Sequence, residues 1–259
     1  MDLGIRGRRA LVSASSKGLG RGVAEALAAA GVDLVLNARG QAALAATAAE
    51  ITGRYGVRVL AVAGDITDAG ACAEVLAAAG AVDILVTNAG GPPPGHWSDW
   101  SRDDFLRAID ANMLTPVALM QACLPGMIAQ GWGRVVNITS AAVKSPIAEL
   151  GLSNTARAGL TGFVAGTARQ VARHGVTINN LLPGLHATDR ATALDAGAAA
   201  KAGITPAEAA ARRAAGIPAG RYGTAAEFGA ACAFLCSAHA GYIIGQNILL
   251  DGGAANATF

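Results

Sequence analysis

Two glycines, Gly18 and Gly20, stand in a short turn between an apolar run at 9–15 (RALVSAS) and an alanine-rich run at about 19–30. The apolar run predicts a β-strand and the alanine-rich run predicts a helix. At such a junction the first amides of the helix point toward the turn, and glycines let an anion approach the backbone closely. Glycine pairs are common in loops, but at the first strand–helix crossover this pair predicts a site for nucleotide phosphates.

The end of the second predicted strand indicates which dinucleotide such a site prefers. Proteins that bind NAD(H) usually place an acidic residue there, because it accepts a hydrogen bond from the ribose 2′-hydroxyl. Here the position holds Ala38, Arg39 follows it, and Lys17 precedes Gly18 in the turn. Two cations without a carboxylate suit a 2′-phosphate, so we expect NADP(H) to be preferred over NAD(H). Alternatively, Arg39 and Lys17 are solvated surface charges.

The elements that must position these residues alternate regularly along the chain. Runs rich in β-branched residues alternate with alanine-rich helical runs, which predicts a parallel sheet covered on both faces with right-handed crossovers. We therefore predict an α/β fold, a single Rossmann-like doubly wound domain spanning residues 1–259 with about seven strands. The predicted strands are 9–15, 32–38, 57–65, 82–90, 133–140, 176–184 and 246–253, and the two longest helices are 103–130 and 152–174.

Residues 187–222 interrupt this alternation. They have little strand character and are rich in alanine and glycine, so we predict one or two short helices that form a lid over the site. Thr224 followed by Glu227 predicts a capping box, because the threonine hydroxyl can accept from the first turn while the glutamate reaches back. The next helix should therefore begin directly after Thr224.

Composition limits the classes of function. The chain is 53% hydrophobic and 15% charged with a formal net charge of +2, which gives no support for a nucleic-acid partner. No apolar run reaches the roughly 18 residues that cross a bilayer, and the N-terminal residues lack the apolar segment of a secretion signal. The four cysteines, Cys72, Cys123, Cys232 and Cys236, have no zinc-site spacing. We expect buried free thiols in a cytoplasmic protein, with no membrane partner and no metal.

Five motifs in a fixed order connect the chain to a known family. They are the turn SASSKGLG (13–20), GDI (64–66), VTNAG (86–90), LLPGLHAT (181–188) and LDGG (250–253). This pattern resembles the short-chain dehydrogenase/reductase family over essentially the whole chain, with Ser13 in place of the threonine of its TGxxxGxG turn and Thr87 in place of the first asparagine of NNAG. Ala14 replaces the first glycine of the turn, which is tolerable at negative φ and strained otherwise.

The resemblance implies a set of residues around the cofactor. Asp65 and Ile66 would lie at the adenine ring, and the segment that begins at Pro183 would lie beside the nicotinamide. The full implied set is Ser13, Ser15, Lys17, Gly18, Leu19, Gly20, Arg39, Asp65, Ile66, Asn88, Ala89, Gly90, Arg157, Pro183, Gly184, Leu185 and Thr188.

The resemblance also implies a catalytic set, and here the chain departs from the family. Asn112 and Ser140 match the family's asparagine and serine, but Ser153 and Arg157 stand where the family has the tyrosine and lysine of YxxxK. A serine hydroxyl is a much weaker acid than a phenol, and loss of a positioned general acid typically costs roughly 10²–10⁴ in rate. Arginine can still hold a ribose but has a pKa above about 12, so it is a poor proton donor.

Other residues could supply the proton. Lys144 lies on the loop after Ser140, where desolvation could lower its pKa, and His186 has an intrinsic pKa suited to acid–base chemistry. Alternatively, Lys144 is an exposed loop lysine and His186 a loop histidine that faces solvent or the lid. His96 could contact substrate or pack in its loop, and Trp97 and Trp100 could wall the pocket or simply pack.

Three functions remain open from the sequence. The first is an NADP(H)-dependent oxidoreductase for a small-molecule carbonyl/alcohol pair, similar to 3-oxoacyl-thioester reductases, with an atypical proton donor. The second is a member of the family that binds NADP but is catalytically impaired, and the third is a non-redox enzyme on the same scaffold. The resemblance implies a homotetramer or homodimer formed through the two long helices and the C-terminal strand.

Overall fold

Seven parallel strands form one sheet in the computed structural model, which describes residues 1–256. The strand order is β3-β2-β1-β4-β5-β6-β7, as expected for a doubly wound fold. The strands are β1 (Arg9–Val12), β2 (Asp33–Ala38), β3 (Val59–Ala63), β4 (Ile84–Thr87), β5 (Gly133–Ile138), β6 (Val176–Pro183) and β7 (Asn247–Leu250). The predicted α/β fold with a single seven-stranded sheet is confirmed.

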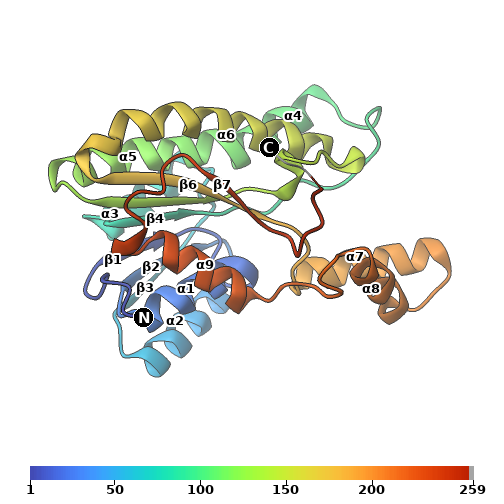
Figure 1. Cartoon of the computed structure of the whole chain (residues 1–259), viewed down its shortest axis with the longest axis horizontal. Helices are drawn as coiled ribbons and strands as arrows, with labels where there is room; N and C mark the ends of the chain where they lie inside the picture. The colour runs from blue at the N-terminus through green and yellow to red at the C-terminus, as the bar shows by residue number, and fades with distance from the viewer. Residues whose placement is uncertain (257–259) are drawn as a thin grey trace.

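Helices cover both faces of the sheet (Figure 1). One face carries α1 (Gly18–Ala29), α2 (Gln41–Tyr55) and α9 (Ala225–Leu235), whose side chains Leu27, Ile51 and Phe228 are almost fully buried. The other face carries α3 (Ala69–Ala79), α5 (Thr115–Ala129) and α6 (Gly151–Val171), and the side chains of Met120 on α5 and of Leu160 and Val164 on α6 are buried. Because both faces are covered, the strands are apolar runs rather than alternating ones.

The order in which successive strands are added to the sheet reverses between β1 and β4. These two strands pair in parallel, yet the chain runs outward from β1 to β2 and β3 before it returns to β4. The turn after β1 and the loop after β4 therefore leave the same edge of the sheet in opposite directions. Such a switch point opens a crevice at the carboxyl ends of the strands, where ligands of this fold class bind.

A row of polar side chains crosses four strands in the sheet interior. Thr87 donates to Asn137 (2.6 Å), Asn137 donates to Asn180 (3.1 Å), and Asn180 donates to Asn247 (2.7 Å). Each pair is also a pair of register partners on neighbouring strands. A one-residue slip would leave these amides unpaired in the core, so the row fixes the register of β4 to β7.

The predicted long helix at 103–130 is interrupted. It consists of α4 (Arg102–Ile109), a π-helical turn (Asp110–Leu114) and α5. Pro116 at the start of α5 has no N–H to bond to the preceding turn, which explains why regular helix does not run through. By length and composition the run Arg102–Ala129 could cross a membrane, but α5 lies against β4 and β5 as a core helix does.

The segment predicted as a lid forms a helical arm. Helices α7 (Asp189–Ala202) and α8 (Pro206–Ala215) pack against each other and extend from the main body (Figure 1). The predicted capping box at Thr224 and Glu227 is confirmed and starts α9. All four cysteines are free, with three of them buried and Cys72 half-buried.

Candidate active site

The turn after β1 contains residues with a left-handed backbone and a glycine that lies in close contact with a neighbouring carbonyl. Gly18 has a φ of +59°, and a Cβ on Gly20 would lie 2.3 Å from the carbonyl oxygen of Ala14. Only glycine fits at Gly20, because the helix must start directly under the turn. Ala14 itself has a φ of +47°, so this departure from the family glycine holds a strained backbone.

Polar side chains in the turn hold it to the neighbouring strands. The Ser13 hydroxyl donates to the Asn88 carbonyl (2.7 Å) and accepts from the Asn88 amide (2.8 Å). The Asn88 side chain donates to the Ala14 carbonyl (3.2 Å), and the Ser15 hydroxyl donates to Val12 (2.9 Å). The side chains of Ser13, Ser15 and Asn88, three of the predicted cofactor residues, are thus used in hydrogen bonds within the protein. Backbone groups of the turn are therefore left to contact a ligand.

The first turn of α1 presents free backbone amides. Lys17 occupies the cap position and its side chain makes no capping hydrogen bond, whereas Thr188 caps α7 through its hydroxyl. Thr188 also lies beside Gly18, 3.7 Å from where a Cβ would stand. Uncapped amides at a helix N-terminus can bind an anion, and Gly18 and Thr188 lie side by side at this N-terminus.

Two cations stand at the edge of this site. Lys17 is exposed and forms an ion pair with Asp189 at 3.1 Å. Arg39 is exposed just beyond β2, on the side of Asp65, whose carboxylate accepts from the backbone and side chain of Thr67 (3.1 and 2.8 Å). These hydrogen bonds first, and the charge of Arg39 to a smaller extent, hold the pKa of Asp65 below its usual range.

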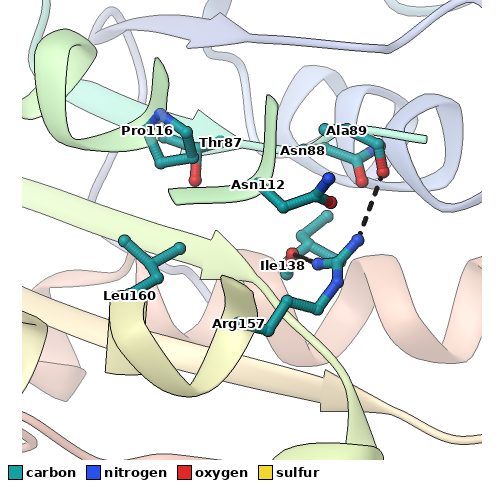
Figure 2. A pocket seen from close by; sticks show the side chains of 8 residues that line it. All are labelled: Thr87, Asn88, Ala89, Asn112, Pro116, Ile138, Arg157 and Leu160. Atoms are coloured by element: carbon teal, nitrogen blue, oxygen red, sulfur yellow. Dashed lines mark hydrogen bonds between the residues drawn. The ribbon is translucent and has the colours of Figure 1, made fainter. Parts of the chain in front are cut away.

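Asn112 lies in the π-helical turn and points into the crevice (Figure 2). Its amide nitrogen donates to the Ala108 carbonyl (3.2 Å), while its buried Oδ1 has no hydrogen-bond partner. A small cavity of about 10 Å³ adjoins it, lined by Thr87, Asn88, Ala89, Asn112, Pro116, Ile138, Arg157 and Leu160. A space of this size next to an unsatisfied acceptor suits one water molecule.

The Arg157 guanidinium is buried and holds the ends of two strands together (Figure 2). It donates to the carbonyls of Ile138 (2.7 Å) and Thr139 (2.8 Å) after β5, and to Ala89 (3.5 Å) after β4. Burial first, and the charge of Arg190 second, lower the pKa of Arg157 to about 10, so it remains charged at neutral pH. No carboxylate among the described residues forms an ion pair with it.

The two serines of the catalytic set come from different elements. Ser140 follows β5 and is half-buried, and its hydroxyl accepts from the Ala142 amide (3.1 Å). Ser153 is buried on α6, one turn before Arg157 and on the same face. Lys144 is half-buried just after the one-turn helix Ala141–Val143, which Ser140 caps.

His186 packs inside the protein. Its ring is buried, meets Phe228 edge to face with centroids 5.3 Å apart, and has Nδ1 3.3 Å from the Gly184 carbonyl. A Cβ on Gly223 would be 2.7 Å from the ring. Burial lowers the pKa of His186, so the ring is neutral at pH 7. These contacts hold it between α9 and the segment after β6 rather than free to reach a substrate.

The strand β6 ends in the predicted nicotinamide segment. Gly184 lies so close to Asp251 that an added Cβ would be 2.6 Å from the aspartate Cβ. Leu250 and Asp251 of the LDGG segment therefore pack directly on Pro183 and Gly184 and fix their position. Thr188, which follows, caps α7.

Sequence reasoning missed Arg190. Its guanidinium donates to the carbonyls of Gly91 (2.9 Å) and Pro92 (3.2 Å), directly after the predicted Asn88, Ala89 and Gly90. No motif marks it, because its partners are backbone atoms of a loop almost 100 positions away.

The two tryptophans for which the sequence allowed either a pocket wall or simple packing differ in burial. Trp100 lies against Gly95 and Gly151, whereas Trp97 is 76% exposed.

Comparison with known proteins agrees with this architecture. The sequence model of the family described as enoyl-(acyl carrier protein) reductase matches residues 13–255. The 3-oxoacyl-acyl-carrier-protein reductase of Salmonella typhimurium is 34% identical over 97% of this chain and 98% of its own length. The chain belongs to the short-chain dehydrogenase/reductase family.

Further relatives extend the comparison. The (2S)-[(R)-hydroxy(phenyl)methyl]succinyl-CoA dehydrogenase subunit BbsC of Thauera aromatica is 34% identical over 98% of this chain and 96% of its own length. The structure of L-sorbose reductase from Gluconobacter frateurii complexed with NADPH and L-sorbose has a TM-score of 0.95 at 28% identity, covering 99% of this chain and 100% of that one. Members of this family are oxidoreductases, so the chain lies among enzymes.

Proposed function

We propose that this short-chain dehydrogenase/reductase is an NADP(H)-dependent reductase of a small carbonyl compound, in which Ser140 binds the substrate oxygen. The observation that carries the proposal is the turn after β1. The absence of a Cβ at Gly20 lets the helix pack directly beneath this turn, the helix N-terminus has no side-chain cap, and Lys17 and Arg39 stand exposed beside it. Helix amides without a side-chain cap, together with cations beside them, suit the phosphates of an anionic dinucleotide.

The residues present fit NADP(H) better than NAD(H). Ala38 at the end of β2 offers no carboxylate to a ribose 2′-hydroxyl, and Arg39 after it is exposed, so a 2′-phosphate has a cation to meet. The related L-sorbose reductase was solved with NADPH. When bound, this cofactor supplies the hydride. The segment Pro183–Leu185 and the loop after β4 would hold its nicotinamide end.

We infer that the proton comes from a group other than the family's phenol, because Ser153 stands at that position. Arg157 is held by three carbonyls and stays charged, and His186 is packed against Phe228. Lys144 is half-buried one short turn after Ser140, and its side chain makes no hydrogen bond or ion pair with the described residues. We infer that Ser140 donates a hydrogen bond to the substrate oxygen and that Lys144 is the proton donor.

The test measures oxidation of NADPH across a panel of ketones, diketones and 3-oxoacyl thioesters. Lys144→Ala should lower kcat by roughly 10²–10⁴-fold, the usual loss when a general acid is removed, while the exposed Lys201→Ala is the matched control and should leave kcat unchanged. Equal rates in Lys144→Ala and wild type would remove Lys144 from the mechanism. The pair Ser153→Tyr with Arg157→Lys should raise kcat if the rest of the crevice is built for the family reaction.

A second function is favoured by one observation. Ser153 offers no strong acid and Arg157 is turned inward to strand ends, so the chain could bind NADP(H) as a non-catalytic partner in a larger assembly. The relative in Thauera aromatica is described as a subunit of a dehydrogenase. NADPH binding without turnover of any substrate in the panel would support this function over the first.

A homo-oligomer and a cytoplasmic location complete the proposal. The free cysteines, three of them buried, accord with a reducing compartment. The oligomer is expected to form through α5, α6 and β7.

A further inference from the structure

Two guanidinium groups donate hydrogen bonds to the same four-residue segment, 89–92, at the mouth of the crevice. Arg157 donates to Ala89 from inside the protein, and Arg190, the second residue of α7, donates to Gly91 and Pro92 from outside. Gly91 makes room for this contact, since a Cβ there would lie 2.6 Å from Arg190 Nη1. The loop after β4 is thus clasped between two positive charges, with neutral backbone oxygens as their partners.

No ion pair among the described residues neutralises the positive charges of Arg157 and Arg190. Among the described residues, neither Arg157, Arg190 nor Lys144 forms an ion pair, and Asp189, which precedes Arg190, is committed to Lys17 at 3.1 Å. Asp99 accepts from the His96 amide within its own turn (3.1 Å). Glu149 is exposed on the one-turn helix Ala148–Leu150. Concentrated charge of one sign in a crevice attracts a ligand of the other sign.

Arg190 is free to bind such a ligand. Its side chain is exposed, and a guanidinium has more N–H donors than the two carbonyls of the loop can take. A planar guanidinium group whose one edge is held by the protein is pre-organised to form two hydrogen bonds to a carboxylate at its other edge. Arg157, by contrast, is buried and can act only through its field.

We propose that the crevice takes a carbonyl substrate that carries a carboxylate, an oxo acid rather than a neutral ketone, and that Arg190 binds this carboxylate. The identity of the reacting carbonyl rests on the proposed reductase function, whereas the carboxylate site depends only on charges seen in the protein. The other anion within reach is the cofactor diphosphate, because Thr188, two residues before Arg190, lies beside Gly18. The experiment therefore separates these two ligands.

The experiment titrates acetoacetate and its neutral methyl ester by calorimetry, into the protein alone and into the protein with NADP⁺, where no hydride is available and no reaction follows. Acetoacetate should bind about tenfold more tightly than the ester, the value of one charge-assisted pair. Arg190→Gln should abolish this preference. Arg212→Gln, an exposed arginine on α8, is the matched control and should keep it.

Three results would overturn the inference. They are equal binding of acid and ester, a preference that survives in Arg190→Gln, and a loss of NADP⁺ affinity in Arg190→Gln as large as the loss for acetoacetate, which would assign Arg190 to the cofactor. If NADP⁺ fails to bind but the preference for acetoacetate is present in the protein alone, the carboxylate site stands and the proposed reductase function falls.

Discussion

Ala14 is the residue at which this chain holds the most evident backbone strain. Its φ of +47° places it in the left-handed region, where a Cβ crowds the carbonyl and costs roughly 1–2 kcal/mol relative to glycine. Glycine at this position would lose more freedom on folding, which offsets part of that cost. The turn is nevertheless imposed, because the Ala14 carbonyl accepts from Asn88 and lies over Gly20.

Ala14→Gly should therefore raise the free energy of unfolding by about 0.5–1 kcal/mol. Urea denaturation followed by circular dichroism measures it. Ala73→Gly, on the exposed side of α3 with ordinary helical backbone, is the matched control and should lower the free energy of unfolding by about the same amount. A loss of stability in both variants would show that the turn is not strained.

His186 makes stability depend on pH with a definite sign. Burial lowers the pKa of the folded histidine below its ordinary value of 6.5, so the unfolded chain takes up its proton first as the pH falls. The contribution of His186 is therefore complete above about pH 6.5 and is lost as the pH falls toward the folded pKa. Other groups add their own slopes, so only a comparison with a variant isolates it.

His186→Gln should show a smaller decrease in the free energy of unfolding between about pH 7 and pH 5 than the wild type does, although it is less stable at pH 7 through lost packing on Phe228. Denaturant melts at both pH values give the comparison. Parallel pH dependence in the two proteins would mean that His186 ionises normally. In the same variant, kcat at pH 7 should fall much less than in Lys144→Ala.

At the scale of elements, the arm of α7 and α8 has a small polar core of its own. The buried Asp195 carboxylate accepts from Arg213 (2.5 Å) and from the Tyr222 hydroxyl (2.8 Å). Burial first, and the bond to Asp195 next, raise the pKa of Tyr222. Since few apolar side chains hold the arm, we expect this cluster to carry much of its order.

Asp195→Asn should remove the ion pair with Arg213 and lower the local stability of the arm by about 2 kcal/mol. Hydrogen exchange of amides in 189–215 should speed up, while exchange in the central strands stays as in the wild type. Arg212→Gln, exposed on the same helix, is the control and should leave the arm protected. Faster exchange everywhere would instead place the cluster in the global fold.

The sequence was informative about elements and weaker about what their side chains do. Alternating strand and helix runs predicted the sheet, and cap signals such as Thr224 with Glu227 predicted where α9 begins, because these depend on neighbours in sequence. The interruption at Asn112 was missed, since the pattern of apolar residues continues through it. Only Pro116, which follows closely, carried a signal.

The burial of the Arg157 side chain and the hydrogen bonds of Arg190 to the loop after β4 could not be predicted from the sequence. Both guanidinium groups bond to backbone carbonyls of distant loops, and carbonyls have no residue-type signature. The asparagine row across β4 to β7 was also missed, although an asparagine recurs near the same level of several apolar strands. Register, not composition, brings those amides together.

At the scale of the whole molecule, α5 and α6 present a surface with open, small positions. Added Cβ atoms on Gly126, Gly162 and Gly166 would meet nothing within 4 Å, and Leu106 and Leu114 nearby in the chain are 45% and 49% exposed. Small residues let two helices approach closely, and exposed leucines favour burial against a partner. We expect a second copy of the chain to cover this surface.

Light scattering should give a mass of two or four times the 25.7 kDa of the chain. Gly166→Lys places a long charged side chain on the open face of α6 and should shift the mass toward the monomer, while Ala73→Gly on α3 should not. A wild-type mass of one chain at micromolar concentration would contradict the expected oligomer.

The central claim is that the uncapped turn with Lys17 and Arg39 binds a 2′-phosphorylated dinucleotide ready to deliver a hydride. Fluorescence titration of NADPH and NADH into the full chain tests it most directly. The account predicts that NADPH binds at least about tenfold more tightly, and that Arg39→Ala removes most of this difference by deleting a charge-assisted contact. Absence of binding by either dinucleotide, or equal binding of both, would contradict it.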